Sequence, residues 1–136
     1  MRFLLLSLGF IVAMYSCDSS KAIVKGDPGE VNVAQSDTVR IANEALEYEI
    51  IIIEPGFNSW LITQFPREYY SIGFLENKNA FFVSAYNRRV TDGRFSRELY
   101  SQFINYEPSV RYGKEVNYLL YNYFVYFEQT FGQKLL

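Results

Sequence analysis

The chain has 136 residues, a formal net charge of −2 and a hydrophobic fraction of 49%, which suits one domain of ordinary size. Aromatic residues are frequent, with 12 Tyr, 12 Phe and 1 Trp, so the chain can bury a core. The absence of histidine and the single cysteine exclude Ser-His-Asp and Cys-His catalysis, histidine zinc sites, cysteine clusters and intramolecular disulfides. The slightly acidic balance argues against nucleic-acid binding, which requires a basic face.

The N-terminus has the pattern of a secretion signal. Arg2 precedes an apolar run over residues 3–13, too short for a membrane span of about 20 residues but suited to the apolar part of a signal peptide. Ser16 stands directly before Cys17, and this junction resembles the lipobox of bacterial lipoproteins. The resemblance implies removal of residues 1–16 and acylation of Cys17, for instance with palmitate. The alternatives are an ordinary secreted protein with a free thiol, or an uncleaved anchor.

We expect residues 17–37 to form a flexible tether that starts at the lipidated Cys17. Aromatic residues are absent from 18–37, and Gly26-Asp27-Pro28-Gly29 interrupts any regular element. A coil of about 20 residues spans roughly 25 Å, which would hold the folded body near a membrane. The alternative is a small hairpin that pairs residues 23–24 with residues 31–33.

Residues 38–136 are predicted to form a single globular domain of the α+β class, mostly α, with one short β ribbon. Between residues 39 and 54 apolar and polar residues alternate, as in a strand, and Asn43-Glu44 suggests a turn. One face of the second strand carries Leu46, Tyr48, Ile50 and Ile52. The other changes from Glu to Ile at Ile51 and Ile53, which predicts that the strand enters the core on both sides. Glu54-Pro55-Gly56 ends it.

Helices are predicted to follow the ribbon. Asn58 is a candidate N-cap for a short helix over 59–64. Residues 69–91 have helical periodicity, with Asn79 inside the apolar arc, where it needs a hydrogen-bond partner if buried. A further short helix is expected over 95–103.

The last segment, residues 112–131, carries the clearest periodicity and predicts a long aromatic C-terminal helix. Its apolar arc consists of Tyr112, Val116, Leu119, Leu120, Tyr123, Phe124, Tyr126, Phe127 and Phe131. The opposite side carries Lys114, Glu115, Asn117, Asn122, Glu128 and Gln129. Gly132 is a suitable residue to end the helix.

Some aromatic residues fall outside these apolar arcs. Tyr118, Tyr121 and Val125 lie on the polar side of the last helix, and Phe74 and Phe81 form a similar pair on the 69–91 helix. If they face outward, they form a candidate interaction surface for a protein or for sugar rings. The alternative is that both stripes belong to the core of a small, aromatic-rich domain.

Two sets of charged residues are further candidate sites. Arg88, Arg89, Arg94 and Arg97 crowd ten residues and could contact an anion, or they form a solvated face paired with nearby carboxylates. Asp92, Glu98 and Glu107 could support a small carboxylate-based hydrolase. The sequence contains no phosphate-binding loop, nucleophile elbow or metal-ligand spacing, so we expect no catalytic residue, no metal and no cofactor.

Segments 47–57, 60–61, 69–70 and 112–118 together resemble a family of short Bacteroidota lipoproteins with a domain of unknown function. The resemblance covers about residues 38–136, implies a location in the cell envelope and carries over no binding or catalytic residue. The sequence thus predicts a lipid-anchored envelope protein, attached to the membrane through Cys17, with a non-enzymatic role as a binding or assembly partner of other envelope proteins. A glycan-binding module is the alternative.

Overall fold

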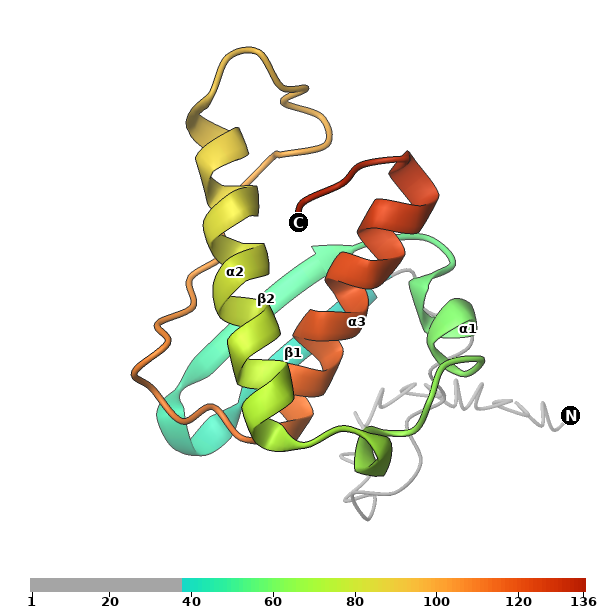
Figure 1. Ribbon diagram of the computed structural model, residues 1–136, viewed down its shortest axis with the longest axis vertical. Coiled ribbons are helices and arrows are strands. Elements are labelled where there is room, and N and C mark those ends of the chain that lie inside the picture. The colour runs from blue at the N-terminus through green and yellow to red at the C-terminus, as the bar shows by residue number, and fades with distance from the viewer. Residues whose placement is uncertain (1–37) are drawn as a thin grey trace, which may run out of the picture. The chain divides into compact units, whose positions relative to one another are not determined.

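The computed structural model describes residues 38–136, and the predicted signal peptide, lipidated Cys17 and tether lie outside this range. The chain forms two strands, β1 (Thr38–Asn43) and β2 (Tyr48–Ile53), then the helices α1 (Phe57–Leu61), α2 (Ile72–Thr91) and α3 (Lys114–Phe131). Two short 3-10 turns, η2 (Glu44–Leu46) and η3 (Arg67–Tyr69), complete the regular structure. In Figure 1, α2 and α3 lie side by side over one face of the ribbon. The predicted class, α+β and mostly helical, is confirmed.

The two strands form an antiparallel ribbon in which Thr38 pairs with Ile53 and Asn43 with Tyr48. Because side chains alternate between the two sides of a strand, one face of the ribbon points inward. The residues of this face are buried: Val39, Ile41, Tyr48, Ile50 and Ile52. The prediction that Ile51 and Ile53 also enter the core is wrong, because they are 51% and 73% exposed. The helices lie over the opposite face of the ribbon (Figure 1), and the side chains of Ile51 and Ile53 lie beside the 98–105 loop instead.

The helix α1 begins earlier than predicted. Gly56 has φ 87° and turns the chain directly into Phe57, so the predicted start with Asn58 as N-cap is wrong. Asn58 instead lies inside the helix and is 7% exposed. Its side-chain nitrogen donates to the Thr38 carbonyl at 3.4 Å, so it ties α1 to the start of β1.

The helix α2 begins at Ile72, three residues later than predicted. Tyr69 instead ends η3, and Tyr70 and Ser71 have extended backbone. The hydroxyl of Ser71 accepts from the Phe74 N–H at 3.2 Å as an N-cap. Its C-terminal end at Thr91 agrees with the prediction. Within residues 38–136, no helix combines enough length and apolar character to cross a bilayer.

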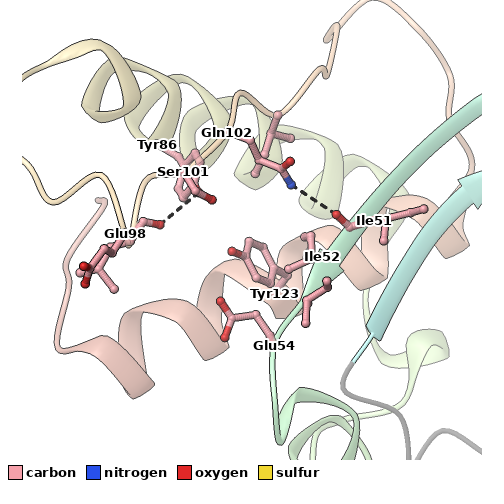
Figure 2. A pocket seen from close by; sticks show the side chains of 11 residues that line it. Ile51, Ile52, Glu54, Tyr86, Glu98, Ser101, Gln102 and Tyr123 are labelled. Atoms are coloured by element: carbon pink, nitrogen blue, oxygen red, sulfur yellow. Dashed lines mark hydrogen bonds between the residues drawn. The ribbon is translucent and has the colours of Figure 1, made fainter.

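The helix predicted over 95–103 is wrong, because residues 92–113 form an irregular loop. This loop runs along β2 and uses its polar groups there: Gln102 donates to the Ile51 carbonyl at 3.3 Å (Figure 2), and Tyr48 donates to the Asn105 carbonyl at 2.6 Å. Tyr100 is 2% exposed. Long-range contacts of this kind outweigh a weak local helical preference.

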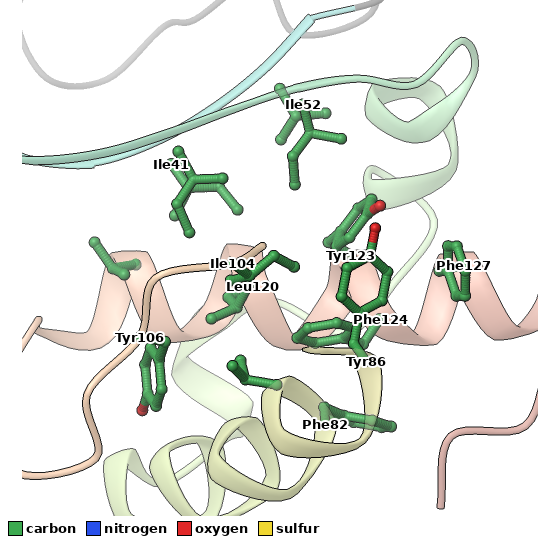
Figure 3. Packing of buried hydrophobic residues seen from close by; sticks show 14 of the residues in the cluster. Ile41, Ile52, Phe82, Tyr86, Ile104, Tyr106, Leu120, Tyr123, Phe124 and Phe127 are labelled. Atoms are coloured by element: carbon green, nitrogen blue, oxygen red, sulfur yellow. The ribbon is translucent and has the colours of Figure 1, made fainter. Parts of the chain in front are cut away.

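The long helix α3 is the centre of the core. It packs on β1 on one side and beside α2 on another, so Leu120, Phe124 and Phe127 are almost fully buried (Figure 3). Gly132 has φ 60° and donates its N–H to the Glu128 carbonyl, which confirms the predicted stop.

The predicted polar face of α3 is wrong for two asparagine residues. Asn117 and Asn122 are 0% and 2% exposed, although the helical periodicity predicts both on the outer side. They are buried because α3 is covered on more than one side, and each donates to the carbonyl four residues earlier: Asn117 to Gly113 and Asn122 to Tyr118, both at 2.8 Å. The side-chain N–H groups of both residues thus find an acceptor one turn earlier in the chain.

Candidate functional site

Aromatic side chains from the 65–70 segment, α2 and α3 form a continuous surface cluster. Phe65 and Tyr69 stack with ring centroids 4.3 Å apart, and Tyr70 stacks on Phe74 at 5.7 Å. Tyr121 contacts both Tyr70 and Phe74, at 5.3 and 5.5 Å. We call this cluster, together with one neighbouring ring, the aromatic patch: Phe65, Tyr69, Tyr70, Phe74, Phe81 and Tyr121.

The aromatic patch is exposed over much of its area. Phe65 and Tyr69 are 58% and 64% exposed, and Phe74 and Phe81 on α2 are 40% and 59% exposed. Phe74 and Phe81 line a groove of about 220 Å³ together with Asn77 and Lys78. Monomeric soluble domains rarely expose contiguous apolar surface of this kind without a use for it.

The sequence leaves open whether these aromatic side chains face outward or belong to the core, and the structure divides them between the two. Phe74 and Phe81 do face outward, and Tyr121 and Val125 are half-buried. Tyr118 follows the core alternative: it is 9% exposed, and its hydroxyl donates to the Phe65 carbonyl at 2.9 Å. The segment before α2 covers this face of α3, so Tyr118 belongs to the packing beneath the patch.

The aromatic patch has members that the sequence pattern does not predict. Helical periodicity places Tyr69 and Tyr70 at the start of the 69–91 helix and gives Phe65 no role. The signal that could have found them is Pro66, since proline disfavours helical backbone in the residue before it and separates Phe65 from the following turn. That turn then places the exposed rings next to each other.

The four arginines do not converge on one anion site. Arg94 forms an ion pair with Asp92 at 2.7 Å, and hydrogen bonds from Arg94 lower the pKa of Asp92 to about 2. Arg89 donates to the Tyr100 hydroxyl at 2.8 Å and lies over the Phe95 ring at 4.9 Å. The remaining two, Arg88 and Arg97, are exposed. The interpretation as a mostly solvated, paired face fits these contacts.

The three carboxylates considered for hydrolysis have separate surroundings. Asp92 is held by Arg94, and Glu107 accepts from the Ser109 hydroxyl at 3.2 Å. Glu98 instead lines a cleft of about 270 Å³ where the end of β2 meets the 98–104 segment (Figure 2). We call it the Glu54 cleft, after a residue that the sequence pattern assigns only to the end of a strand.

The Glu54 cleft combines carboxylates with buried phenols. Burial raises the pKa of the half-buried Glu54 and raises that of Tyr86 to about 12. Burial also raises the pKa of Tyr123, whose hydroxyl interacts with that of Tyr86. Tyr86 donates to the Leu99 carbonyl at 3.3 Å. Both phenols are therefore neutral hydrogen-bonding groups at neutral pH.

Neither the candidate sites nor similarity to characterised proteins assigns an activity to the chain. Residues 38–136 hold no group of three His, Cys, Asp or Glu side chains that could bind a metal ion. No curated protein and no solved structure matches the chain. A family model described as a family of unknown function, DUF6146, matches residues 3–136. The chain therefore belongs to the DUF6146 family.

Proposed function

We propose that this chain is a lipid-anchored protein of the bacterial cell envelope that binds another envelope protein through the aromatic patch. The observation that carries the proposal is the exposure of Phe74 and Phe81 on either side of one groove on α2. Aromatic side chains are enriched at protein interfaces, where a few buried rings supply most of the binding free energy. The proposed role requires no catalytic step and no cofactor.

The groove also indicates the chemistry of its partner. Lys78 lies between the two rings, and none of the ion pairs among residues 38–136 involves it. A partner segment that inserts one apolar side chain between the rings and places a carboxylate on Lys78 would match both properties. Charge complementarity of this kind gives orientation and specificity more than affinity.

Attachment to the membrane is the second part of the proposal and rests on the sequence. The apolar run over 3–13 and the lone Cys17 have the order of a lipoprotein signal, and the family model begins at residue 3. An N-terminal diacylglycerol with an amide-linked acyl chain would anchor the protein stably, because one chain alone gives only reversible binding. The expected location is the periplasmic or surface-facing side of an envelope membrane.

The binding test is immunoprecipitation of the full chain from detergent-solubilised envelopes, with identification of the captured proteins. We expect one partner to be lost with the Phe74→Ser/Phe81→Ser double variant and with Lys78→Glu, and kept with Lys78→Arg. Phe103→Ser is the matched control, since Phe103 is 60% exposed but lies in the loop beside β2. Capture that is equal for all variants would contradict the proposal.

The anchor is tested separately by fractionation. Wild-type protein is expected in the membrane fraction with an acylated residue 17, whereas Cys17→Ala is expected to lose acylation and leave that fraction. An unmodified Cys17 in membrane-bound wild-type protein would contradict the anchor but not the binding surface.

The glycan-binding alternative has one supporting observation, the exposed stack of Phe65 on Tyr69, since sugar rings bind on exposed aromatic faces. Envelope polysaccharide fragments added to the full chain separate the two functions. Saturable quenching of tyrosine fluorescence that Tyr69→Ala abolishes would favour the glycan, and loss of the protein partner on the same addition would place both ligands on one surface.

A further inference from the structure

The Glu54 cleft is built from four parts of the chain and is separate from the aromatic patch. Glu54 follows β2, Tyr86 and Tyr123 come from α2 and α3, and Glu98 and Gln102 come from the loop between these helices (Figure 2). None of the residues that line it is a lysine or an arginine. The cleft therefore offers oxygen atoms and negative charge but no cation of its own.

Glu54 is the central group of this cleft. It is half-buried, and among residues 38–136 no ion pair and no side-chain hydrogen bond reaches its carboxylate. A carboxylate removed from water is unfavourable unless a cation or hydrogen-bond donors compensate it. A ligand that brings a positive charge would supply this compensation.

The walls favour an organic cation over a metal ion. Residues 38–136 contain no group of three acidic, histidine or cysteine side chains able to coordinate a metal. The two phenol rings are 2% and 3% exposed, and Ile52 and Ile53 add apolar surface beside the carboxylates. A carboxylate attracts an ammonium group through charge, and apolar walls accept the attached methylene groups.

We infer that the Glu54 cleft binds a primary alkylammonium group, with its charge on Glu54 and its methylenes against the β2 end of the cleft. The group can belong to a free aliphatic amine or to the lysine side chain of a protein. Both present the same –CH₂–NH₃⁺ chemistry, so the experiment below distinguishes them. This site does not depend on the aromatic patch, and either can fail without the other.

The test is a titration of the ¹⁵N-labelled full chain at neutral pH, followed by NMR, with three probes. These are n-butylammonium chloride, the neutral n-butanol, and N-acetyl-lysine N-methylamide. We expect saturable shifts of the amides of Ile53, Glu54 and Gln102 with an ammonium probe and none with n-butanol. Tighter binding of n-butylammonium would identify a free amine as the ligand class, and tighter binding of the lysine amide would identify a protein side chain.

Two variants decide whether Glu54 is responsible. Glu54→Gln keeps the size of the side chain and is expected to weaken ammonium binding about tenfold or more, since a hydrogen bond to a charged group is lost. Glu47→Gln is the matched control, because Glu47 is an exposed carboxylate outside the cleft. Unchanged affinity in Glu54→Gln, equal shifts with n-butanol, or no shifts with either ammonium probe would overturn the inference.

Discussion

The side-chain nitrogen of Asn79 on α2 donates to both the backbone carbonyl and the side-chain oxygen of Asn117 on α3, at 2.9 and 3.0 Å. Both residues are 0% exposed, and the Tyr106 hydroxyl donates to the same Asn117 oxygen at 2.8 Å. The Asn79 oxygen has no partner among residues 38–136. A buried polar contact between the two long helices therefore fixes how they pack, since only one register pairs these groups.

Replacement of Asn79 by alanine tests this contact. The change removes both donated hydrogen bonds and leaves a small void, so we expect a loss of about 1–3 kcal/mol in the free energy of unfolding. Urea denaturation of the full chain measures it, with Asn77→Ala as the control because Asn77 is exposed on the same helix. A change below about 0.5 kcal/mol, the size of an ordinary surface substitution, would contradict the structural role.

Two aromatic substitutions should differ strongly because one ring is buried and the other is exposed. Tyr118→Ala is expected to cost about 3–5 kcal/mol, as for a core aromatic residue, whereas Phe81→Ala should change the stability by no more than about 0.5 kcal/mol. Tyr118→Phe, which keeps the ring and loses the bond to the Phe65 carbonyl, should cost about 1 kcal/mol. Thermal or urea unfolding of the three variants gives the comparison. Equal costs for Tyr118→Ala and Phe81→Ala would show that the ring environments are misassigned.

The sequence predicts the fold where one periodicity dominates. The apolar stripe of α3 and Gly132 define that helix to within two residues at its start, and alternation predicts the inward face of the ribbon. Asn79 also behaves as predicted, because a polar residue inside an apolar arc must find a partner. These features depend on local spacing, which a sequence displays directly.

Features that depend on what covers a face could not be predicted in the same way. Tyr118 is buried because the segment before α2 covers the predicted polar arc of α3. Ile53 is 73% exposed because it lies on the face of β2 opposite the helices. The candidate site shows the same limit. Helical spacing identifies Phe74 and Phe81, whereas Phe65 and Glu54 acquire their surroundings only from contacts across the fold.

Two glycines should respond in opposite ways to replacement by alanine. Gly132 ends α3 with φ 60°, so Gly132→Ala should destabilise the protein by about 1 kcal/mol, since a Cβ is strained there. Gly73 lies within α2, and no atom of another segment lies within 4 Å of the place that an alanine methyl would take. Gly73→Ala should therefore stabilise the protein by up to about 0.5–1 kcal/mol. Thermal unfolding of both variants checks the signs. Stabilisation by Gly132→Ala would contradict the left-handed ending of α3, and destabilisation by Gly73→Ala would contradict the open space beside Gly73.

The Asp92–Arg94 pair predicts an acid-sensitive contribution to stability. The pKa of Asp92 falls from 3.8 to about 2 in the folded state because Arg94 donates to the carboxylate. A lowered folded pKa contributes stability that is present above about pH 4 and is lost as the pH falls toward 2. We expect Asp92→Asn and Arg94→Gln to show a shallower decline of the urea midpoint than wild type across this interval. A wild-type decline that matches both variants would contradict the pairing.

We propose that the groove between Phe74 and Phe81 binds another envelope protein. The most direct measurement is photo-cross-linking in living cells with p-benzoylphenylalanine at position 81, compared with the same residue at the equally exposed position 103. We expect a protease-sensitive adduct at position 81, formed to an acidic and apolar segment of one protein, and no such adduct at position 103. The same adducts at both positions, or an adduct at position 81 that resists protease and yields to polysaccharide-degrading enzymes, would contradict it.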